Sequence, residues 1–185
     1  MKVLVPLAEG FEEIEALTII DVLRRADIET VSLYLKTEYV NGSHGITVKA
    51  DMAAAAADGN QYDAIVLPGG MPGSKNLLES SVVTGLLNQI NKKNGFIAAI
   101  CAAPMVLGHA GLLKGKKAVC FPGYESHLAG AEILKKPVVA DGNIITGIGA
   151  GAALDFSLKL VEIFKNRETA LKLRSAMQIF WQEGN

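Results

Sequence analysis

The sequence predicts one α/β domain, residues 1–185, built on a doubly wound parallel sheet with helices on both faces. Three observations support this. Short apolar runs alternate along the chain with segments of helical periodicity, an order typical of parallel sheets with crossover helices. The strand-like runs are apolar throughout, which indicates burial on both faces. At 185 residues and 50% hydrophobic content, the chain is long enough for one sizeable core.

The N-terminal half begins with an apolar run that ends at Leu7 and leads into a segment of helical periodicity. Thr30 and Tyr34 favour extended structure in the next apolar run. Asn41-Gly42 is a turn dipeptide and indicates a small hairpin. The elements expected here are a strand at 2–7, a helix at 12–25, a strand at 28–35, a turn-rich excursion or hairpin at 40–48, an alanine run without clear structure at 53–57 and a buried strand at 63–67.

The C-terminal half repeats the alternation. Pro104 suits the first turn of a helix, Gly111 closes that helix, and Asp141-Gly142 predicts a hairpin turn. The expected elements are a helix at 82–93, a strand at 96–100, a helix to about 110, a strand at 117–121, a hairpin at 138–146, and helices at 152–164 and 168–181, the last of them largely exposed.

Charge, cysteine count and the N-terminal segment exclude several classes of protein. The net charge is −1 with acids and bases interspersed, so nucleic acid and membrane surfaces are not expected partners. Two cysteines, Cys101 and Cys120, are too few for a disulfide framework and match no zinc spacing. The first apolar run is too short for a signal peptide, and no run approaches the ~18 apolar residues of a spanning helix. We therefore expect a cytoplasmic protein.

Cys101 stands where the apolar run 96–100 turns sharply into the helix that contains Pro104. Ligands of open parallel sheets bind beyond the carboxyl ends of the strands. A thiol at a helix N-terminus can have its pKa lowered from ~8.5 to roughly 3.5–7.5. One interpretation is therefore a nucleophilic thiol. The other is a small buried hydrophobe, because unpaired cysteine is among the most buried residue types.

Glu15 is the second candidate. On the expected helix it shares one stripe with the apolar residues Ile19, Val22 and Ala26. A carboxylate on an apolar stripe is costly unless it is protonated or well paired. A buried glutamate with a raised pKa could hydrogen-bond to a thiolate or act as a general acid or base. The alternative is that Glu15 merely complements the helix dipole.

Two backbone amides are candidates for an oxyanion hole. Gly69-Gly70 follows the strand at 63–67 and allows a ligand to approach the backbone closely. The Gly70 amide, paired with the amide of Ala102, would give the usual two donors. A simple turn is the alternative interpretation. The ends of the strands at 2–7, 63–67 and 96–100 would face one crevice if these strands are neighbours.

The remaining motifs carry weaker signals. The glycine-rich segment 147–151 lacks the Lys-Ser/Thr of a nucleotide loop. Cys120 is most simply a core thiol. His109 falls within an expected helix and His127 in a loop, and neither has the spacing of a base for the nucleophile. His44 lies on a loop and could reach a site, including that of a partner subunit.

Three motifs carry a resemblance to a known family. They are Ala8-Glu9-Gly10-Phe11-Glu12-Glu13-Ile14-Glu15, Asp63-Ala64-Ile65-Val66-Leu67-Pro68-Gly69-Gly70 and Ala98-Ala99-Ile100-Cys101-Ala102-Ala103-Pro104. Together they resemble the ThiJ/PfpI superfamily, most of all its DJ-one branch, and the resemblance runs from residue 2 to about residue 165. It implies a flavodoxin-like sandwich and a homodimer.

The resemblance also implies roles for individual residues. Cys101 matches the reactive nucleophile and Glu15 the protonated glutamate beside it. Gly70 and Ala102 match the backbone donors that face the site, and we include Gly69 and His44 among the candidate substrate-binding residues. The implied chemistry needs no cofactor, and we expect no metal.

Two positions depart from the family pattern. The DJ-one branch commonly has a histidine near the nucleophile where this chain has Phe121. The peptidase-like branch carries histidine directly after its cysteine, where this chain has Ala102. A protease or a Cys-His-Asp hydrolase is therefore disfavoured. Proton transfer would fall to Glu15, and to His44 across the dimer.

The resemblance implies an enzyme that acts on small reactive carbonyls, either a glyoxalase that converts methylglyoxal to lactate or a deglycase for early glycation adducts. The Cys101 thiolate would add to the aldehyde, and Glu15 would move the proton between carbons. Two alternatives stay open. One is a redox-sensing stress-response or chaperone-like protein switched by oxidation of Cys101. The other is another cysteine hydrolase or hydratase of the superfamily.

Overall fold

A seven-stranded sheet forms the centre of the protein in the computed structural model, which describes residues 1–179. Its strand order is β10-β11-β7-β6-β1-β2-β5. Every neighbouring pair is parallel except the antiparallel hairpin β10–β11 at one edge. The strands are β1 (Lys2–Leu7), β2 (Glu29–Tyr34), β5 (Met52–Ala53), β6 (Ala64–Leu67), β7 (Phe96–Ile100), β10 (Val138–Asp141) and β11 (Ile144–Gly147).

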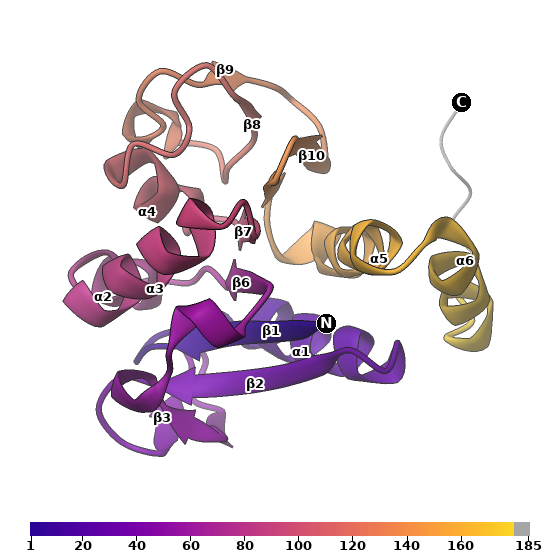
Figure 1. The fold of residues 1–185 in the computed structure, drawn as a ribbon, viewed down its shortest axis with the longest axis horizontal. Helices are drawn as coiled ribbons and strands as arrows, with labels where there is room; N and C mark the ends of the chain where they lie inside the picture. Colours follow the sequence, from indigo (N-terminus) through magenta and orange to yellow (C-terminus); the bar gives the residue numbers. More distant parts are fainter. Residues whose placement is uncertain (180–185) are drawn as a thin grey trace.

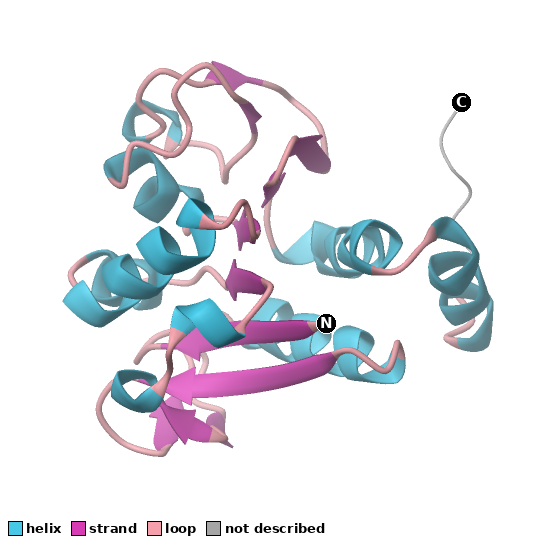
Figure 2. Cartoon of the chain, in the orientation of Figure 1, coloured by secondary structure: helices cyan, strands magenta, loops and turns pink. Residues whose placement is uncertain are grey.

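Helices cover both faces of this sheet (Figures 1 and 2). Alternate residues of a strand enter two different cores: Val3 and Val5 of β1 pack with α1 and α5, whereas Leu4 packs with α3 and α4 on the other side. Burial on both faces explains why the central strands β6 and β7 are apolar throughout. The helices are α1 (Glu13–Arg25), α2 (Gly73–Leu78), α3 (Ser81–Lys92), α4 (Pro104–His109), α5 (Ala153–Phe164) and α6 (Arg167–Ala176). The predicted doubly wound fold is confirmed.

Two small sheets and four short 3₁₀ helices complete the described chain. The antiparallel hairpin β3–β4 turns after Asn41, as the Asn41-Gly42 signal predicted. The second small sheet is the parallel pair β8–β9. The strands of the two small sheets are β3 (Tyr39–Asn41), β4 (Thr47–Lys49), β8 (Lys117–Ala118) and β9 (Glu132–Ile133), and the 3₁₀ helices are η1 (Ala54–Ala56), η2 (Gly59–Gln61), η3 (Glu125–His127) and η4 (Ala150–Ala152). Within residues 1–179, no helix combines the length and apolarity needed to cross a bilayer.

The structure corrects two expectations and adds one helix that the sequence did not predict. The predicted strand at 117–121 ends at Ala118 and lies outside the main sheet, because the next residues bond to other groups: the Val119 amide donates to Thr146 Oγ1 (2.9 Å) and the Phe121 amide to the Cys101 carbonyl (2.8 Å). The short helix α2 was missed. The last helix ends at Ala176 rather than at Trp181, which lies outside the described residues.

The strand order brings the candidate motifs together. β7, β6 and β1 are neighbours and parallel. Their carboxyl ends lead into Cys101, into Gly69-Gly70 and into the loop before the helix that carries Glu15. The sheet therefore places all three candidates at one edge, where ligands of such sheets bind.

Candidate active site

Cys101 occupies a sharp elbow between β7 and α4. Its φ of 65° lies in the left-handed region, which few residues other than glycine adopt. Two backbone bonds hold the elbow: the Cys101 amide donates to the Gly147 carbonyl (2.9 Å), and the Phe121 amide donates to the Cys101 carbonyl (2.8 Å). The thiol is only partly buried. Strained backbone of this kind concentrates at functional sites.

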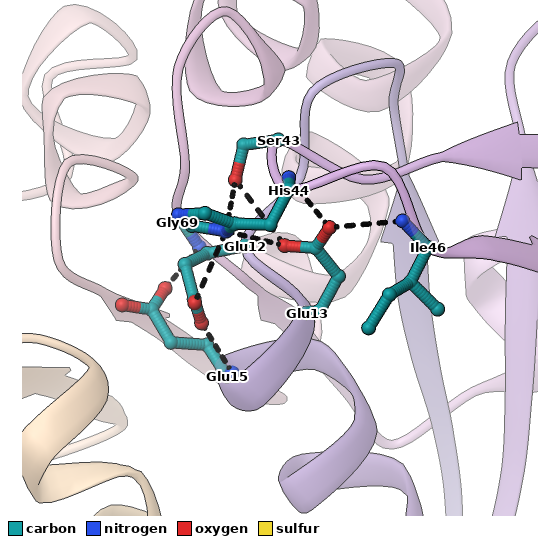
Figure 3. A network of polar contacts seen from close by, with 7 residues as sticks. All are labelled: Glu12, Glu13, Glu15, Ser43, His44, Ile46 and Gly69. Carbon is teal, nitrogen blue, oxygen red and sulfur yellow. Dashed lines mark hydrogen bonds and ion pairs between the residues drawn. The ribbon is translucent and has the colours of Figure 1, made fainter.

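Glu15 approaches Cys101 from the first turn of α1 and is fully buried. Its Oε2 accepts a hydrogen bond from the Gly69 amide (2.8 Å), and its amide donates to Oε2 of Glu12, the N-cap residue (2.7 Å) (Figure 3). The carboxyl faces the Cys101 thiol. Its other oxygen, Oε1, is buried without a hydrogen-bond partner among the described residues. A buried carboxylate oxygen without a partner is costly, which favours the protonated form of this carboxyl.

Burial raises the pKa of Glu15 to about 7, from an ordinary value of 4.5. The hydrogen bonds from Gly69 and Cys101 oppose this change, and the charge of Glu12 adds to it. Near neutral pH the Glu15 carboxyl is therefore poised to hold or release a proton, as a general acid or base requires.

The pKa of Cys101 departs from the sequence-based expectation. Burial and the ionised Glu15 carboxylate raise it to about 12, whereas hydrogen bonds from the Gly70 and Ala102 amides lower it. The expectation of a lowered pKa considered only the helix N-terminus and left out the adjacent carboxylate. The Cys101 thiolate is consequently favoured only where Glu15 carries the proton.

The glycines after β6 make the close approach possible. A Cβ at Gly69 would lie 2.6 Å from the Cβ of Cys101 and 2.6 Å from Oε2 of Glu15. Gly70 has a φ of 88°, and its amide points to the Cys101 sulfur together with that of Ala102. The structure thus brings five of the six predicted site residues together around one thiol.

His44, the sixth, contacts Glu13 instead of Cys101. Its Nδ1 lies 2.8 Å from Oε2 of Glu13, whose other oxygen accepts the His44 and Ile46 amides at 2.6 and 3.4 Å (Figure 3). Burial raises the pKa of Glu13, but these bonds outweigh burial and lower it to about 2, while Glu13 raises the pKa of His44. The network fastens the β3–β4 hairpin to α1.

Sequence reasoning missed the roles of Glu12 and Glu13. Glutamate is not among the preferred N-cap residues, so nothing marked Glu12 as the cap of α1. The partners of Glu13 come from a hairpin 30 or more residues away. Glu12, Glu13 and His44 also bring one potential metal-ligand atom each within 4.8 Å of one another. Because the Glu13 oxygens are already committed to hydrogen bonds, we assign this cluster a structural role.

A separate cavity of about 270 Å³ opens at the same edge of the sheet, beyond β1 and β2. It is lined by Leu7, Ala8, Glu9, Leu35, Lys36, Thr37, Val40, Asn76, Glu79 and Ser80. None of the six candidate site residues lines it, so the cavity is distinct from the group of residues around Cys101.

Replacing Glu15 by Gln should change how stability depends on pH. Because the folded-state pKa is raised, protonation of Glu15 stabilises the wild-type fold below about pH 4.5, and this contribution is lost as pH rises through about 7. A shift from 4.5 to about 7 corresponds to about 3 kcal/mol. Urea unfolding at a series of pH values measures this. Between about pH 4.5 and pH 7, the free energy of unfolding of wild type should fall by up to that amount relative to the free energy of unfolding of Glu15→Gln.

The matched control is Glu168→Gln, at a side chain that is 75% exposed. Its stability should follow the wild-type pH profile. Parallel profiles for wild type and Glu15→Gln would show that Glu15 is not held neutral by the fold.

Comparison with known proteins identifies the family of the chain. The DJ-1/PfpI family matches residues 1–163. Protein DJ-1 homolog B of Arabidopsis thaliana is 41% identical over 95% of this chain, but the chain spans only 40% of that longer protein. Protein dj-1beta of Drosophila melanogaster is 38% identical over 95% of this chain and 96% of its own length. A protein named as a deglycase from Pyrococcus abyssi is 28% identical over 89% of this chain and all of its own length.

Among solved structures, oxidised DJ-1 of Toxoplasma gondii superposes with a TM-score of 0.93 at 40% identity, covering 97% of this chain and 99% of the other. The fold, the family match and relatives of nearly equal length agree. The chain therefore belongs to the DJ-1/PfpI family.

Proposed function

We propose that the protein is a cofactor-free enzyme that acts on small reactive carbonyls through Cys101. The contact of a fully buried glutamate with a partly exposed cysteine, opposite two backbone amides, carries this proposal. Such a site combines a nucleophile, a proton carrier and oxyanion donors. The likeness to a protein named as a deglycase supports the same chemistry.

The geometry suggests a sequence of steps for methylglyoxal. The Cys101 thiolate adds to the aldehyde carbon, and the new oxyanion accepts hydrogen bonds from the Gly70 and Ala102 amides. Glu15 protonates this oxygen, removes the hydrogen from the former aldehyde carbon, and returns it as a proton to the neighbouring carbon. In the same step the hydroxyl proton on the former aldehyde oxygen moves to the former ketone oxygen, so that the first becomes a carbonyl and the second a hydroxyl. The product is a thioester of lactate. Water then hydrolyses it, which releases lactate and restores the thiol.

A homodimer is part of this proposal. The side chains of Ile14, Leu17 and Ile46 are 59%, 38% and 53% exposed, although they lie on α1 and on the hairpin fastened to it. A contact through this face would cover them and place His44 at the interface. Light scattering should give twice the 19.6 kDa chain mass; a monomer would contradict the dimer.

Purified protein incubated with methylglyoxal should produce lactate. Cys101→Ser should reduce this to the level without protein, and Glu15→Gln should lower kcat by roughly 10²–10⁴-fold, the usual range for loss of a general acid or base. Cys120→Ser is the matched control, because Cys120 is buried in the opposite core. Lactate at background level with wild type, or undiminished turnover in Cys101→Ser, would reject the proposal.

Redox sensing is the second candidate, and the placement of the two thiols favours it. Cys101 is partly exposed while Cys120 is 4% exposed, and the Gly70 and Ala102 amides that face Cys101 could bond to sulfinate oxygens. A structural relative is described as oxidised. Here Cys101 oxidation would alter a surface or dimer contact.

Mild peroxide should add two oxygens to Cys101 alone. Intact-mass analysis should find this adduct in wild type and in Cys120→Ser, but not in Cys101→Ser. Oxidation that distributes equally between the two cysteines, or its complete absence, would count against a sensor.

A further inference from the structure

Phe121 is a large apolar residue that lies beside the nucleophile and remains 47% exposed. Its amide donates to the Cys101 carbonyl at 2.8 Å. Two residues earlier, the Val119 amide donates to Thr146 Oγ1 on β11 at 2.9 Å. The segment from Val119 to Phe121 therefore crosses the carboxyl ends of β7 and β11, which places Phe121 directly next to the elbow.

The Phe121 ring packs against the loop that follows β11. A Cβ built at Gly149 would lie 3.2 Å from Cδ2 and 3.7 Å from Cε2 of Phe121, so one edge of the ring covers this glycine. Gly149 comes two residues after Gly147, whose carbonyl accepts the Cys101 amide at 2.9 Å. The ring is thus supported on one side by Gly149, while the side chain as a whole stays 47% exposed.

A second exposed apolar side chain adjoins the site from β6. Met71 is 43% exposed and directly follows Gly70, whose amide points to the Cys101 sulfur. Single exposed apolar residues are common on protein surfaces. Here, however, two of them belong to segments that bond directly to the nucleophilic residue. Exposed apolar residues in segments that border a nucleophile are typical of a binding site for an apolar group.

We propose that the Cys101 site prefers α-oxoaldehydes with an apolar or aromatic substituent over small hydrophilic ones, and that Phe121 determines this preference. The inference rests on the proposed function and names its substrate class. The aldehyde carbon bonds to Cys101 while the substituent stacks on the open part of the Phe121 ring. Aromatic contact and burial of apolar surface then favour phenylglyoxal over glyoxal.

The test compares kcat/KM for phenylglyoxal and glyoxal. Phe121→Ala should lower the phenylglyoxal-to-glyoxal ratio of kcat/KM about tenfold, the scale of apolar pocket discrimination. Phe121→Tyr should restore the ratio, since it keeps the ring. Leu171→Ala, at a 50% exposed position on α6, is the control and should leave the ratio unchanged. An unchanged ratio in Phe121→Ala would overturn the proposal.

A second readout separates this inference from the proposed function. In a Cys120→Ser background, the alkylation rates of Cys101 by N-phenyliodoacetamide and by iodoacetamide are compared without any turnover. In wild type, Cys101 should react faster with the phenyl reagent than with iodoacetamide. The ratio of the two rates should fall about tenfold in Phe121→Ala. If neither oxoaldehyde is turned over but this preference holds, only the enzymatic proposal fails. The same ratio of alkylation rates in wild type and in Phe121→Ala, or no alkylation of the folded protein, overturns the role of Phe121.

Discussion

The direct contact between the buried Glu15 carboxyl and the Cys101 thiol is the constraint around which the site is built. This contact requires the segments that follow β1, β6 and β7 to pack closely at one edge of the sheet. A side chain at Gly69 would collide with both partners. The elbow at Cys101 must take a left-handed conformation to present the thiol. Glu12 must cap α1 so that the helix begins where Glu15 can reach the sulfur.

This contact makes the two protonation states interdependent. Burial raises the pKa of Cys101 most, and an ionised Glu15 raises it further. A protonated Glu15 removes this repulsion and can donate its hydrogen to the sulfur, where the Gly70 and Ala102 amides already stabilise negative charge. The reactive state is therefore a thiolate beside a neutral carboxylic acid. The Gly70 and Ala102 amides lower the pKa of Cys101, but burial and an ionised Glu15 outweigh them.

The sequence was most informative where a signal is local. The strand at 96–100 has the predicted bounds, and the elbow at Cys101 follows from its small neighbours and Pro104. Features that depend on distant segments were not predictable. Val119 and Phe121 leave the expected strand because their amides find partners on β11 and at the elbow. The raised pKa of Cys101 likewise depends on Glu15, which is 86 positions earlier in the chain.

The location of the shared proton is the quantity that tests this account most directly. Thiolate absorbance, taken as wild type minus Cys101→Ser, can be followed with pH alongside the infrared band of a protonated carboxyl that disappears in Glu15→Gln. The account predicts that both signals are present together near neutral pH. A neutral thiol beside an ionised Glu15 at that pH, with thiolate forming only near pH 12, would contradict it.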